Sequence, residues 1–249
     1  MMHLFMMHLV MMHSVILIEK RDITVPNTSF TLEFNAKHAK LTLQMLILLE
    51  ISLVMLYVFD HFFLGFGKEH HIFNLDEELT IPSWFSSMQL FSIGLLFLMQ
   101  NFRSPPPKNI SLNFLSLVGI GFLFLSLDET IAIHELMTYK LTHISWLPRF
   151  KNNMGLWIPI YAGIGSILLI LSRQKIIQAW QFYRKELIIF TVGFLMVVMG
   201  GVILEIISYE FLRVDELKKW YLLEVTLEEC LEMMGSSIML YAGMLFTLH

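Results

Sequence analysis

Three carboxylates and an imidazole follow the longest apolar part of one predicted helix. The segment SLDETIAIHE (126–135) contains Asp128, Glu129, His134 and Glu135, and it follows a mostly apolar run over residues 112–127. Carboxylate and imidazole groups bind divalent cations, and they also accept and donate protons near neutral pH. The segment therefore predicts an ionisable site at the end of an apolar helix.

A second acidic group lies near the C-terminus. In EVTLEECLEMMG (224–235), Glu224, Glu228 and Glu232 repeat every four residues, and Glu229 lies at the edge of the same helical face. Like charges at this spacing repel each other. A helix start would explain the first two acids through the helix dipole, but it explains Glu232 less well. The stripe therefore favours a role in a site, with a helix start as the alternative.

The position of Asp128 and its neighbours along the helix makes it costly in free energy to bury them in the membrane as charged groups. If one helix continues to residue 135, Asp128 and Glu135 share a face two turns apart. If the third span enters near Phe114, Asp128 lies in the outer third of the hydrocarbon layer. A charge at the centre of a span costs about 2.5–3.5 kcal/mol, and it costs less near the interface. Such groups must pair, hold protons, coordinate a cation or face water.

The leading hypothesis is a divalent-cation site of unknown metal identity. We expect Asp128, His134 and Glu135 as its core, and Glu129 or Glu135 as the base if the protein is an enzyme acting on a lipid or small amphiphile. The Glu-x-x-His spacing of di-iron bundles is absent from the sequence. The complete predicted metal-ligand set is Asp128, His134, Glu135, Glu228 and Glu232, with Asp76 or Glu77 capping it from a loop.

Three alternatives use the same residues. A proton- or cation-coupled transporter would bind its cation at these acids and use Glu50 as a relay near the middle of the first span. An assembly protein would dock a basic partner on them, although the sequence identifies no protein partner. A structural polar network between spans would need no ligand at all.

The composition supplies the elements that must position this site. Hydrophobic residues make up 56% of the chain and charged residues 15%, against roughly 25% charged residues in soluble domains. We therefore expect an all-α integral membrane protein in a lipid bilayer, a bundle of about six transmembrane helices over residues 39–249. The predicted spans are residues 41–64, 84–102, 111–134, 155–172, 187–208 and 226–247.

Other features limit the remaining possibilities. The net charge of −4 argues against a nucleic-acid partner, and the single cysteine, Cys230, excludes an intrachain disulfide. Residues 1–38 are expected to form a poorly ordered cytoplasmic segment. It begins with the repeat MMHLF MMHLV MMHSV, which is typical of duplicated coding DNA, with a copper-binding tract as the alternative.

The distribution of Lys and Arg predicts the topology. These residues are somewhat more frequent in the N-terminal segment and in the second and fourth loops, which favours both termini in the cytoplasm. The same topology brings almost every acidic or His residue of the predicted spans to the outer face, with Glu50 as the exception.

The motifs LDEELTIPSWFSS, FLSLDETIAIHE and LEECLEMMG occur in this order over residues 75 to 240. In this respect the chain resembles a group of uncharacterised bacterial polytopic membrane proteins. The resemblance implies a multi-pass protein of the bacterial inner membrane with about six spans. It implies no activity.

Overall fold

The computed structural model describes residues 35–64, 72–148, 150–151, 154–212 and 218–249. Contacts divide the chain into two units, residues 1–33 and 34–249, and all described residues belong to the second. The MMHxx repeat, His70 and His71 lie outside the described residues.

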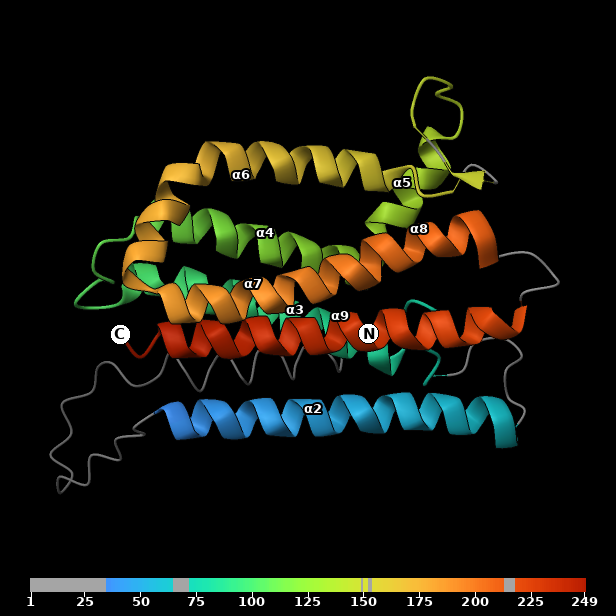
Figure 1. Cartoon of the computed structure of the whole chain (residues 1–249), viewed down its shortest axis with the longest axis horizontal. Helices are drawn as coiled ribbons and strands as arrows, with labels where there is room; N and C mark the ends of the chain where they lie inside the picture. Colours follow the sequence, from blue (N-terminus) through green and yellow to red (C-terminus); the bar gives the residue numbers. More distant parts are fainter. Residues whose placement is uncertain (1–34, 65–71, 149, 152–153, 213–217) are drawn as a thin grey trace, which may run out of the picture. The chain divides into compact units, whose positions relative to one another are not determined.

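The described part of the chain is helical and contains no strand, as the sequence predicted for the fold class (Figure 1). π-helical turns cover Asp60–Leu64, Met199–Leu204 and Ser208–Leu212, and a 3-10 turn covers Gln100–Phe102. The helices are α2 (Ala36–Phe59), α3 (Ile81–Met99), α4 (Leu112–Ile131), α5 (Ile133–Leu141), α6 (Trp157–Phe182), α7 (Arg184–Val198), α8 (Glu205–Ile207) and α9 (Lys218–Phe246).

Five helical segments in the described residues are long and apolar enough to cross a membrane. They are Ala36–Phe63, Ile81–Phe102, Leu112–Ile131, Trp157–Phe182 and Arg184–Leu212. Helix α9 is not among them, because the acidic residues 224–232 interrupt its first half. Its second half, from Met233 to Phe246, carries no acidic or basic residue.

Glycines allow two pairs of helices to approach closely. A Cβ atom added at Gly94 of α3 would lie 2.8 Å from the carbonyl oxygen of Gly119 in α4. A Cβ atom added at Gly193 of α7 would lie 2.5 Å from the carbonyl oxygen of Gly235 in α9. Small residues at such crossings let the backbones come into contact, as in many membrane helix pairs.

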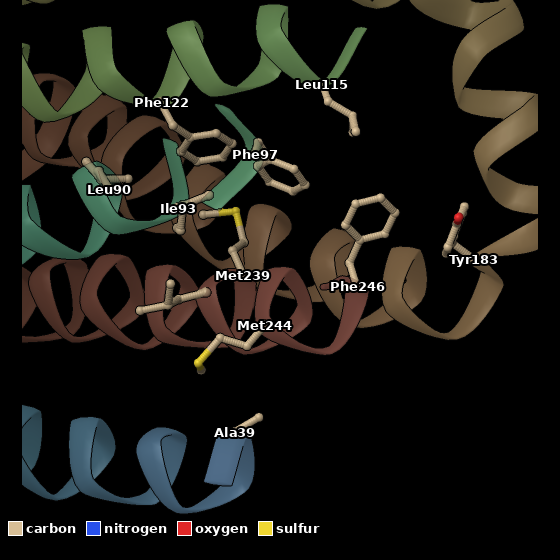
Figure 2. Packing of buried hydrophobic residues seen from close by; sticks show 11 residues of the cluster. Ala39, Leu90, Ile93, Phe97, Leu115, Phe122, Tyr183, Met239, Met244 and Phe246 are labelled. Atoms are coloured by element: carbon tan, nitrogen blue, oxygen red, sulfur yellow. The ribbon is translucent and has the colours of Figure 1, made fainter. Parts of the chain in front are cut away.

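The largest buried apolar cluster joins α3, α4 and α9. Figure 2 shows Leu90, Ile93 and Phe97 of α3 beside residues of α4 and α9. Phe97 lies 6.1 Å from Phe246 between ring centroids. Helices α2 and α9 also contact each other. Helix α9 therefore packs against α2, α3 and α7, and it holds its acidic residues among them.

The third predicted helix is divided in two, which differs from the single helix expected over 111–134. Ala132 adopts left-handed backbone angles, with φ 51° and ψ 49°, and separates α4 from α5. The side chain of Asp128 accepts a hydrogen bond from the backbone N–H of His134 (2.8 Å), so it competes with helical hydrogen bonding. The expected common helical face of Asp128 and Glu135 is therefore wrong.

Candidate functional site

Asp128 and His134 form an ion pair at the junction of α4 and α5. One carboxylate oxygen, Oδ1, lies 3.2 Å from Nδ1 of His134 and also accepts the backbone N–H of that residue. The imidazole packs against Trp157 at 5.3 Å between ring centroids. Burial lowers the pKa of His134, but the hydrogen bond and the charge of Asp128 outweigh it and leave that pKa raised.

Glu78 approaches this pair from the loop before α3. The hydroxyl of Ser83 donates to Oε2 of Glu78 at 2.9 Å and also lies 3.2 Å from the backbone oxygen of Glu129. Burial raises the pKa of Glu78, while Ser83 and the charge of His134 act in the opposite direction. The sequence predicted its neighbours Asp76 and Glu77 as ligands instead, because no periodic pattern distinguishes the three loop acids.

The acids of α9 lie close to Glu205 of α8. Glu228 is buried, and its side chain interacts with those of Glu205, Glu224 and Glu232. The hydroxyl of Tyr209 donates to Oε1 of Glu205. Glu205 lies near the end of the predicted span 187–208, but it is not among the predicted ligands.

Glu232 connects the residues around the Asp128–His134 pair with Glu205 of α8. Its charge interacts with those of Glu129, Glu205, His134 and Glu78. A Cβ atom added at Gly201 would lie 2.5 Å from Oε1 of Glu232. The glycine in this π-helical turn therefore leaves the space that the carboxylate occupies.

We call the resulting group the acidic cluster. It joins the loop before α3 with helices α4, α5, α8 and α9, since Glu229 also interacts with Glu129, Glu78 and Glu232. Its members are Glu78, Asp128, Glu129, His134, Glu205, Glu228, Glu229 and Glu232.

Residues 53–248 match a protein family described as a domain of unknown function, DUF8692. The chain belongs to this family. The match contains the whole acidic cluster. No curated protein and no solved structure matches the chain.

The other predicted ligands of this DUF8692 protein, Glu135, Asp76 and Glu77, are not members of the acidic cluster. Glu135 is exposed, although its charge interacts with Glu78 and His134. Asp76 is also exposed, and its Oδ1 accepts a hydrogen bond from the hydroxyl of Tyr221 at 2.7 Å. Glu77 accepts a hydrogen bond from Thr80 through its backbone oxygen.

The donor groups do not form a metal site in the described part of the chain. Among those residues, no three His, Cys, Asp or Glu side chains are placed to hold one metal ion. The ion pairs found there are His134–Asp128, Lys151–Glu210 and His249–Glu186. None of these ion pairs of the described residues includes a glutamate of the acidic cluster. The divalent-metal site stays a prediction.

Proposed function

We propose that this DUF8692 protein is a multi-pass membrane protein that binds protons at the acidic cluster, as a proton-coupled transporter does. The observation that carries the proposal is the grouping of the buried Glu228 with Glu205, Glu224 and Glu232. Carboxylates that are buried beside one another repel, and a proton on one of them removes that repulsion.

Burial supports the same conclusion. Glu224 is 5% exposed and Glu228 9% exposed. Removing several neighbouring charges from water is costly unless they are paired or neutralised. A proton neutralises each carboxyl without the convergent geometry that a metal ion requires.

Membrane insertion is part of the proposal. The five apolar helical segments and the many large apolar side chains on their outer surfaces favour a lipid environment, with Leu171 76% exposed as an example. We propose α9 as a sixth span, because its acids face protein rather than lipid. We propose that the protein lies in a bacterial inner membrane. The Lys and Arg distribution favours both termini in the cytoplasm, and this topology places the acidic cluster near the outer surface of that membrane.

The proposal can be tested with purified protein in lipid vesicles that contain a pH-sensitive dye. A potassium diffusion potential set by valinomycin would drive protons inward. We expect faster acidification with the wild type than with the Glu228→Gln/Glu232→Gln variant. Glu186→Gln is the matched control, because Glu186 pairs with His249 away from the cluster, and it should behave as the wild type does.

Elemental mass spectrometry of the same samples separates protons from a metal. The proposal predicts no stoichiometric Zn, Mn, Mg or Ca. A wild type that acidifies no faster than protein-free vesicles would contradict the proposal. Stoichiometric metal that is lost in the Glu228→Gln/Glu232→Gln variant would instead support the predicted cation site.

A further inference from the structure

A second buried carboxyl lies apart from the acidic cluster, in the middle of α2. Glu50 is fully buried, with 0% exposure. Its Oε1 accepts a hydrogen bond from Nε2 of Gln89 in α3 (2.8 Å) and one from the hydroxyl of Ser237 in α9 (2.6 Å). Nε2 of Gln89 also lies 2.7 Å from the Ser237 oxygen. Three helices therefore converge on one carboxyl group.

The other oxygens at this position lack donors. Oε2 of Glu50 and Oε1 of Gln89 are buried and have no hydrogen-bond partner. Gln89 is itself only 2% exposed. An ionised carboxylate that is removed from water and receives two hydrogen bonds on one oxygen leaves the other oxygen uncompensated. A proton on Oε2 removes the charge and converts that oxygen into a donor.

Among the described residues, the side chains that hydrogen-bond to Glu50 supply no countercharge. They are the neutral amide of Gln89 in α3 and the neutral hydroxyl of Ser237 in α9. Cys230 of α9 is an ionisable group whose charge interacts with Glu50, and a thiolate would add negative charge. These neighbours favour a neutral Glu50.

We propose that Glu50, Gln89 and Ser237 form a second proton-binding site, in which Glu50 holds an exchangeable proton. The inference rests on a different helix and on different contacts from the acidic cluster. It therefore stands whether or not the cluster binds protons.

Polar residues of α9 lie between the acidic cluster and Ser237, which donates a hydrogen bond to Glu50. Glu229 and Ser237 are eight residues apart on one face, or about 12 Å along the axis. Glu232 and Ser236 are four apart on a neighbouring face, and both serines are buried. Exchange breaks the O–H bond of Glu50 and leaves a carboxylate, and a proton from water forms the bond again, with no change in oxidation state.

Infrared spectroscopy of the full-length protein in lipid tests the site. Protonated carboxylic acids absorb apart from carboxylates, and their carbonyl band shifts when the proton is replaced by deuterium. We expect the wild type to show a band that shifts in D₂O and is absent from Glu50→Gln. The Glu228→Gln/Glu232→Gln variant should keep this band, so a failure at the cluster is distinguishable from a failure at Glu50.

A second variant protects the test against a folding defect in Glu50→Gln. Ser237→Ala removes one hydrogen bond to Glu50, so it should move the frequency of the same band without removing it. Three results would overturn the proposal: identical bands in the wild type and in Glu50→Gln, a Glu50 band that does not shift in D₂O, or a Na⁺-dependent thermal stabilisation that Glu50→Gln abolishes. The last result would assign a metal cation to this site.

Discussion

The buried carboxyl groups differ in how their charge is compensated. Asp128 has an imidazole partner and a backbone N–H donor. Glu228 has other carboxyl groups as neighbours. Glu50 has an amide and a hydroxyl. The surroundings of Glu228 and Glu50 favour the neutral acid, whereas Asp128 takes part in an ion pair, so substitution should act differently at Asp128 and at the two glutamates.

The Asp128–His134 pair should give a pH-dependent contribution to stability. The pKa of His134 is raised above its ordinary value of about 6.5. The stabilisation is therefore complete below that value and is lost as the pH rises through the raised pKa. We expect Asp128→Asn to lower the free energy of unfolding by about 1–3 kcal/mol at pH 6, as for a hydrogen bond to a charged group.

Thermal or chemical unfolding in detergent at a series of pH values measures this effect. The difference between the wild type and Asp128→Asn should decrease from pH 6 to pH 9. His134→Gln is the control, because it removes the titrating group and should remove the pH dependence of that difference. A difference that is constant over the range would show that the pair does not contribute through the charge of His134.

At the scale of helices, glycine contacts determine which elements hold the acidic cluster. Gly193 and Gly235 allow α7 and α9 to pack closely. A Cβ atom added at Gly200 would lie 2.7 Å from the carbonyl oxygen of Glu228. The helix that carries Glu228 and Glu232 is therefore held against the helix that continues to Glu205. Close backbone contact positions the carboxyl groups before any ligand binds.

Gly193→Ala should destabilise the protein, whereas Gly163→Ala should not. The added Cβ at Gly193 meets backbone atoms of α9, which cannot move away as a flexible side chain can, while nothing lies within 4 Å of Gly163. We expect a loss of about 1–3 kcal/mol for Gly193→Ala, which is typical of overpacking. Gly163→Ala should be neutral or gain up to about 1 kcal/mol from helix propensity. Equal unfolding midpoints for the two variants would contradict the proposed α7–α9 contact.

The junction between α4 and α5 gives a prediction of the opposite sign. Ala132 adopts φ 51°, a left-handed conformation that costs a residue with a Cβ roughly 1–2 kcal/mol. Ala132→Gly should therefore raise the free energy of unfolding by about 1 kcal/mol. Ala162→Gly, within α6, should lower it by roughly 0.5–1 kcal/mol. If both variants lose stability to the same extent in unfolding experiments, the helix does not break at Ala132.

For the whole molecule, the sequence predicted the helical class but not the contacts that build the site. Long apolar runs require helices, and the four-residue spacing placed Glu228 and Glu232 on one face of α9. The helix break at Ala132 was not predicted. It depends on the hydrogen bond between the side chain of Asp128 and the backbone N–H of His134, which are six positions apart. Glu78 and Glu205 were not selected, since their proximity to the cluster depends on how the loop before α3 and helix α8 pack against other helices.

The topology gives a prediction for the whole molecule. In a Cys230→Ser background, a cysteine at Ser145, after α5, should react with a membrane-impermeant maleimide on intact cells. A cysteine at Ser104, between α3 and α4, should react only after permeabilisation. Both serines are exposed, so accessibility within the protein does not separate them. The reverse labelling pattern would place the acidic cluster on the cytoplasmic side.

The central claim is that the acidic cluster holds protons near neutral pH. Acid–base titration of the purified protein in unbuffered detergent solution counts these protons directly. Between pH 9 and pH 5, the wild type should bind more protons than the Glu228→Gln/Glu232→Gln variant, and Glu186→Gln should differ less from the wild type at neutral pH. If the wild type and the cluster variant bind the same number of protons throughout this range, the claim is contradicted.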